Sequence, residues 1–217
     1  MMAVLSYRLR SQDNFIGYWQ PQVSLEYKVT PLYSHNNSIE ERHFYYKDNS
    51  SFWQVQQLDL SHFSQYKFLD NQTVALGIQY RFRENFIEDE QNELRFTQQF
   101  NKTVRGFVVR HGHRFRAEQR IKSDATTHRF RYRYALDFPI AGQTLDVNEF
   151  FIAVATESLF SMASESKPEW DQRLMINMGT AFNSLITVEF GLEYRLENYS
   201  RELQHILIVN SGLNFSL

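Results

Sequence analysis

The chain has 217 residues, a formal net charge of −2 and no cysteine. This length suits one ordinary domain or one closed barrel, and the near-neutral charge gives no basic surface for nucleic acid. The lack of cysteine excludes disulfides and thiolate metal sites, and no window holds the 18 apolar residues of a transmembrane helix. We therefore expect one domain over residues 1–217, and we assign it no metal, no cofactor and no nucleic-acid partner.

The dominant pattern is an alternation of polar and apolar residues, as where Glu189, Glu193 and Arg195 alternate with Phe190 and Tyr194. Side chains of a strand point alternately to its two faces, so each such segment has one charged and one apolar face. In chain order the predicted strands are 5–9, 23–29, 38–46, 52–68, 74–82, 93–102, 106–121, 129–138, 146–160, 170–182, 185–197 and 205–217. Twelve strands is the predicted count, with ten as the main alternative.

Long alternating strands in this number predict an all-β fold, an antiparallel transmembrane up-and-down β-barrel. A strand of about 14 residues spans roughly 46 Å and, at a tilt of about 40°, rises about 35 Å, enough to cross an apolar band about 25 Å tall. A soluble lipocalin-type barrel with its apolar face inward would show the same alternation. Such barrels typically have about eight strands, which favours the membrane barrel.

The predicted connections tend to alternate between short and long. Short turns are expected at Asp70-Asn71 and Asn183-Ser184, and longer connections at 84–92, 161–169 and 198–202. Outer-membrane barrels have short periplasmic turns and longer outer loops. The order of the connections predicts that the C-terminus lies on the rim with the short turns.

Charged residues share the polar face of the predicted strands, and we expect them to form a network in the lumen. Its predicted members are Arg114, Arg116, Glu118, Arg120, Arg129, Arg131, Arg133, Glu149, Asp171, Arg173, Glu189, Glu193 and Arg195. An Arg on the lipid face near the midplane would cost about 2–4 kcal/mol, so the inward direction follows from the barrel. Two interpretations remain open: a core of ion pairs that fills a narrow barrel, or a constriction that selects anions.

Trp19, Trp53 and Trp170 lie near predicted strand ends, where tryptophan anchors a barrel at the membrane interface. The paired histidines His111 and His113 lack a third metal ligand.

No catalytic constellation is evident. A lipase on the barrel wall would need Ser, His and an orienting Asn or Asp together on the outer surface. No nucleophile motif marks Ser158, Ser161 or Ser184, and a dyad such as Asp171 and Glu189 is expected to be part of the lumen network.

Several segments together resemble an uncharacterised family of bacterial outer-membrane β-barrel proteins, a domain of unknown function. They are 113–120 (His-Arg-Phe-Arg-Ala-Glu-Gln-Arg), 129–133 (Arg-Phe-Arg-Tyr-Arg), 148–151 (Asn-Glu-Phe-Phe), 171–174 (Asp-Gln-Arg-Leu) and the opening stretch 19–42. The resemblance covers about residues 15–217 and implies a fold and a location in the bacterial outer membrane. It brings no catalytic residues.

Residues 1–10 lack the apolar core of an export signal, so we expect that the signal has been removed or that the true start lies elsewhere. Three functions remain open for a barrel that contacts membrane lipid. It could be a structural barrel or a narrow anion-leaning channel for an unidentified small solute, an accessory subunit bound to other outer-membrane proteins, or an outer-membrane hydrolase.

Overall fold

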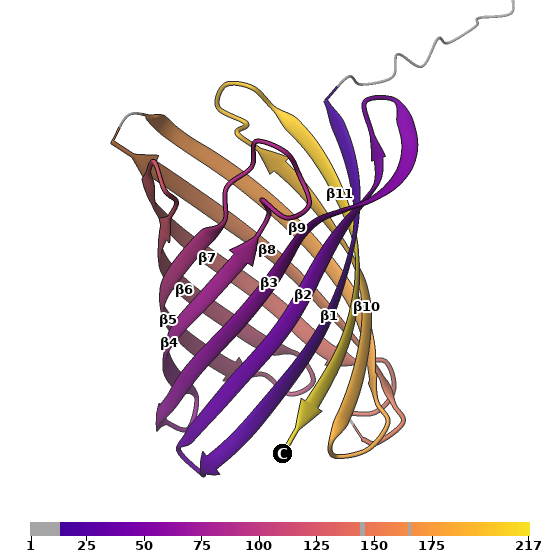
Figure 1. Ribbon diagram of the computed structural model, residues 1–217. Helices are drawn as coiled ribbons and strands as arrows, with labels where there is room; N and C mark the ends of the chain where they lie inside the picture. Colours follow the sequence, from indigo (N-terminus) through magenta and orange to yellow (C-terminus); the bar gives the residue numbers. More distant parts are fainter. Residues whose placement is uncertain (1–13, 144–145, 165) are drawn as a thin grey trace, which may run out of the picture.

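The computed structural model describes residues 14–143, 146–164 and 166–217 as one closed β-barrel (Figure 1). Its strands are β1 (Phe15–Thr30), β2 (Tyr33–Lys47), β3 (Ser50–Leu69), β4 (Gln72–Phe82), β5 (Glu93–Arg105), β6 (Arg110–Ile121), β7 (Thr126–Pro139), β8 (Phe150–Ala163), β9 (Ser166–Ala181), β10 (Ile186–Glu197) and β11 (Gln204–Ser216). Neighbours in sequence are neighbours in the barrel, and β1 closes it against β11. Among the described residues, no helix is long and apolar enough to cross a membrane.

The described residues form eleven strands, one fewer than the predicted count of about twelve and one more than the alternative of ten. Each strand reverses direction at its turn, and an odd number therefore leaves the first and last strands running the same way. β1 pairs with β11 in parallel, from Phe15 opposite His205 to Glu26 opposite Ser216, and the sheet is mixed rather than wholly antiparallel. The additional strand predicted at 5–9 lies outside the described residues.

The odd strand count places the beginning of β1 and the C-terminus at opposite ends of the barrel (Figure 1). We call these the N-terminal end and the C-terminal end. The C-terminal end carries the connections 31–32, 70–71, 106–109, 140–149 and 182–185, and the N-terminal end carries 48–49, 83–92, 122–125, 164–165 and 198–203. The predicted alternation of short and long connections is therefore wrong, because each end carries both kinds.

The long connection predicted at 161–169 is also wrong. Ser166, Lys167 and Pro168 look like loop residues, yet β8 runs on to Ala163 and β9 begins at Ser166. The register shifts between Ser161 and Ala163, which leaves Lys167 and Pro168 in an irregular step of the ladder. A bulge is a position where a strand accepts proline, because no ladder hydrogen bond is needed there.

The two faces of the sheet are inverted relative to a water-soluble protein. The outer face is aliphatic and aromatic, with Leu76 67% exposed and Phe190 61% exposed, whereas Asp59, Glu93 and Glu118 on the inner face are each 2% exposed. The period-2 alternation produces this division, since successive side chains of a strand point to opposite faces.

Trp19, Trp53 and Trp170 lie on the outer face, each within the first few residues of a strand that starts at the N-terminal end. Trp19 and Trp53 lie 5.4 Å apart by ring centroids, with His43 stacked on Trp53 at 5.0 Å. Trp170 packs on Phe160 at 4.7 Å. The three indoles thus form a partial belt around one end of the barrel.

Candidate functional site

The barrel encloses a cavity of about 650 Å³ whose wall is mostly charged. Twelve arginines of the described chain line it: Arg42, Arg81, Arg83, Arg95, Arg114, Arg116, Arg120, Arg129, Arg131, Arg133, Arg173 and Arg195. Six carboxylates line it with them: Glu40, Asp59, Glu118, Glu157, Glu193 and Glu197. Formal positive charge therefore exceeds negative charge on the cavity wall.

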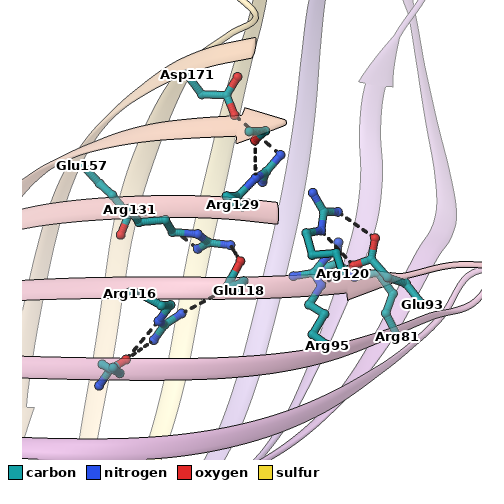
Figure 2. Close-up of polar contacts among 12 residues, drawn as sticks. Arg81, Glu93, Arg95, Arg116, Glu118, Arg120, Arg129, Arg131, Glu157 and Asp171 are labelled. Atoms are coloured by element: carbon teal, nitrogen blue, oxygen red, sulfur yellow. Dashed lines mark hydrogen bonds and ion pairs between the residues drawn. The ribbon is translucent and has the colours of Figure 1, made fainter. Parts of the chain in front are cut away.

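A continuous series of ion pairs crosses the interior from β6 to β10, and Figure 2 shows its first part. Its members are, in order around the barrel, Glu118, Arg131, Glu157, Arg173, Glu193 and Arg195. The pairs at the two ends of this series are short, at 2.6 Å between Glu118 and Arg131 and 2.6 Å between Arg195 and Glu193. The links between them measure 3.6 to 3.8 Å. Each buried charge thus faces an opposite one, as buried charges require.

Two further groups occupy the β3–β6 side. Glu93 accepts from Arg95 on its own strand and from Arg120 on β6 at 2.9 Å (Figure 2). Asp59 on β3 accepts two hydrogen bonds from Arg81 on β4, one of them from Nε at 2.7 Å. Two parallel contacts fix the guanidinium plane as well as its position. These groups extend the ion pairs of the lumen to its β3–β6 side.

Twelve of the thirteen residues predicted for the lumen network lie on the inner face: Arg114, Arg116, Glu118, Arg120, Arg129, Arg131, Arg133, Asp171, Arg173, Glu189, Glu193 and Arg195. The assignment of Glu149 is wrong. β8 begins at Phe150 instead of 146, so Glu149 lies in the preceding connection, where its Oε2 accepts from the backbone N–H of Asp146 at 3.2 Å.

Sequence reasoning missed Glu157, which joins Arg131 to Arg173. The alternation of β8 hides it, because Ala155 and Leu159 share its inward face while Thr156 and Ser158 face outward. The pairing register of the strands identifies Glu157 as a lumen residue better than the polar–apolar alternation does. Glu157 lies directly opposite Arg133 on β7 and opposite Arg173 on β9.

In the described part of the chain, three arginines of the cavity wall form no ion pair with a carboxylate: Arg42, Arg114 and Arg133. Arg114 and Arg133 lie directly opposite each other on β6 and β7, an arrangement in which like charges repel. Arg114 donates from Nε only to Asn101 Oδ1, at 3.2 Å. In the described part of the chain, Arg133 makes no hydrogen bond or ion pair, and it also borders a second cavity of about 270 Å³ beside Glu189. Two like charges therefore lie side by side here, with Glu157 opposite Arg133 on the next strand.

One side of the N-terminal end of the lumen, formed by β1, β2 and β11, is apolar. Tyr18, Phe44, Ile206 and Ile208 form a buried cluster, and Ile87 packs against it. Ile87 belongs to the connection 83–92, which folds back at this end of the barrel (Figure 1).

Internal contacts hold the connection 83–92 in this shape. Arg83 pairs with Glu90 at 3.0 Å, and Asn92 donates to Glu84 at 3.0 Å. Gln54 of β3 donates to the carbonyl oxygen of Phe86 at 3.2 Å. The connection and the cluster together form a cap, which we define as Ile87 with Tyr18, Phe44, Ile206 and Ile208.

The fold and the lumen define a closed β-barrel with an ion-paired, arginine-rich interior. The model of the family described as "Protein of unknown function (DUF2490)" matches residues 16–205, and the chain belongs to that family. This confirms the resemblance to an uncharacterised family. Among solved structures, the siderophore receptor PirA from Pseudomonas aeruginosa matches with 13% identity and a TM-score of 0.32, over 84% of this chain and 34% of the receptor chain. A comparison with curated proteins found no match.

Proposed function

We propose that the protein is an outer-membrane β-barrel of a Gram-negative bacterium and that its lumen binds small anions. The main support for the membrane location is that the outer face of the barrel is apolar and the inner face is charged. Leu174 and Ile176 on β9 and Phe115 on β6 are half exposed or more on the outside, while the charges lie within. A soluble monomer rarely exposes a continuous apolar surface of this extent, whereas lipid covers it in a membrane barrel.

The anion preference is supported by the excess of arginine on the cavity wall. Most guanidinium groups there form an ion pair with a carboxylate, but in the described chain Arg42, Arg114 and Arg133 do not. Of these, Arg114 and Arg133 lie opposite each other. Arginine binds sulfate, phosphate and carboxylate oxygens through paired N–H donors. An anion between these two side chains would relieve their mutual repulsion, in addition to the attraction of Glu157 opposite Arg133.

Sulfate should therefore stabilise the folded barrel. In detergent at constant ionic strength, exchanging chloride for sulfate should raise the thermal unfolding midpoint, since a ligand at about ten times its Kd adds about 1.4 kcal/mol to the folded state. The double variant Arg114→Gln/Arg133→Gln should lose this shift. Arg105→Gln, at the exposed end of β5, is the matched control and should keep it. An equal sulfate shift in wild type and double variant would contradict the site.

A further inference from the structure

The outer wall of β2 and β3 carries a histidine that contacts both an asparagine and a serine. Asn37 of β2 lies directly opposite His62 of β3. His62 and Ser64 are two residues apart on one strand and so point to the same face. His62 Nδ1 lies 2.8 Å from Asn37 Oδ1, and His62 Nε2 lies 3.4 Å from Ser64 Oγ. The three side chains thus form an ordered series from amide to imidazole to hydroxyl.

The contacts of His62 set its tautomer. Asn37 Oδ1 can only accept, so His62 must donate its Nδ1–H, which leaves the lone pair of Nε2 facing the hydroxyl of Ser64. This is the arrangement of nucleophile, base and orienting group in hydrolases that act through serine. The distance of 3.4 Å is long for a hydrogen bond, but catalytic contacts commonly tighten only when substrate binds.

A second histidine completes the cluster. His35 Nδ1 lies 3.3 Å from Ser64 Oγ, and the rings of His35 and His62 are 5.1 Å apart. Because the serine proton faces His62, the nitrogen of His35 is placed to donate to the serine oxygen. In the described ranges no amide or carboxylate orients the ring of His35, so His62 is the better base and His35 a donor beside the reacting centre.

The surroundings of the cluster indicate the class of substrate. Ser64 borders an apolar groove of about 820 Å³ together with Tyr66, Val74, Leu76, Phe100 and Phe115. Asn37 and His62 border a second groove of about 600 Å³, formed by Val23, Leu25, Ile39, Leu60, Ile78 and Leu94. The nucleophile therefore lies between two apolar channels on the outside of the barrel, where extended acyl chains would fit.

The position of the cluster along the barrel, close to the expected headgroup level of the bilayer, fits a lipid substrate. Tyr33 and Tyr66 face each other one step nearer the C-terminal end than His35 and Ser64. Tyrosine favours the headgroup level of a bilayer, and the ester bonds of a phospholipid lie just below that level. Polar and ionisable groups on a membrane-facing surface are costly and are functional-site candidates by default.

We propose that Ser64, His62 and Asn37 are the catalytic set of a hydrolase that cleaves acyl esters of membrane phospholipids. The inference rests on the membrane location proposed above. Ser64 Oγ attacks the ester carbonyl carbon while its proton passes to His62 Nε2. The bond from that carbon to the glycerol oxygen then breaks, and the alcohol leaves with the proton. Water adds to the acyl-serine with His62 again as base, which releases the fatty acid and restores Ser64.

The full chain, reconstituted in phosphatidylethanolamine and phosphatidylglycerol vesicles, tests this directly. Wild type should release free fatty acid, and Ser64→Ala and His62→Ala should each reduce the rate by at least about 100-fold, as expected for members of one catalytic unit. Ser158→Ala and His113→Ala are matched controls. Ser158 donates to Gln172 at 2.7 Å and His113 contacts Tyr132 at 3.0 Å, both on the same outer face but away from the cluster. Both controls should keep the wild-type rate.

A second measurement tests the reactivity of Ser64 in the absence of a membrane. In detergent micelles, a fluorophosphonate probe should label wild type on the peptide that contains Ser64, and His62→Ala should be labelled more slowly. Absence of both labelling and fatty-acid release in the folded protein, or full activity in Ser64→Ala, would overturn the hydrolase. Failure to enter vesicles would instead overturn the proposed location, while labelling in micelles would still report on Ser64.

Discussion

Replacing Glu118 with glutamine should lower the free energy of unfolding by about 3–5 kcal/mol, the range expected when one partner of a buried ion pair is removed. The Glu118 side chain is 2% exposed and pairs with Arg131 at 2.6 Å and with Arg116 at 3.6 Å. Its neutral replacement would leave two buried guanidinium groups without their shared carboxylate. Denaturant unfolding in detergent, followed by tryptophan fluorescence, measures the change.

The matched control for this experiment is Glu149→Gln. Glu149 lies in the connection before β8 and, among the described residues, accepts only from the backbone of Asp146. Its replacement should therefore change stability by less than about 0.5 kcal/mol. Arg131→Leu should also lower heat resistance, because it removes the other partner. The double variant Glu118→Gln/Arg131→Leu should recover part of the summed loss, since contacting residues are not additive. Full additivity would contradict a direct pair.

Loosening the cap should raise the conductance of the barrel. Ile87 packs on the cluster of Tyr18, Phe44, Ile206 and Ile208 at the N-terminal end, and an apolar constriction excludes water and ions. In planar bilayers, Ile87→Gly should therefore raise the conductance several-fold, and the reversal potential in a salt gradient should favour anions.

The control for the cap is Ile140→Gly, which removes an exposed isoleucine from the connection at the other end. This variant should conduct like wild type. Adding Arg114→Gln and Arg133→Gln to Ile87→Gly should abolish the anion preference while the pore stays open. Wild-type conductance in Ile87→Gly would show that the cap does not close the lumen.

Much of the fold could be predicted because the alternation of side chains is a local property. In β10, for example, the alternation alone identifies Glu189, Glu193 and Arg195 as the inward-facing residues. The strand count could not be predicted, because it depends on whether β1 closes directly on β11, a contact between residues 190 positions apart. Glu157 was missed for a related reason, since its partners lie on neighbouring strands.

The cluster on the outer wall was beyond sequence analysis for the same physical reason. A search for serine nucleophile motifs finds nothing at Ser64, because no local motif is required when the base lies two residues away on the same strand. Asn37 joins His62 only through the β2–β3 register. That register contains irregular steps between Arg42 and His43 and between Phe44 and Tyr46, which polarity alone does not reveal.

The central claim is that the outer face meets lipid while the arginine-bearing face encloses water and ions. The chain has no cysteine, so a single spin label can be placed at Leu192→Cys on the outer face or at Ser38→Cys on the cavity wall. In bilayer nanodiscs, oxygen but not a water-soluble nickel chelate should relax the label at 192, and the label at 38 should show the weaker oxygen contact. A label at 192 that the nickel chelate relaxes as readily as oxygen does would place the outer face in water and contradict the account.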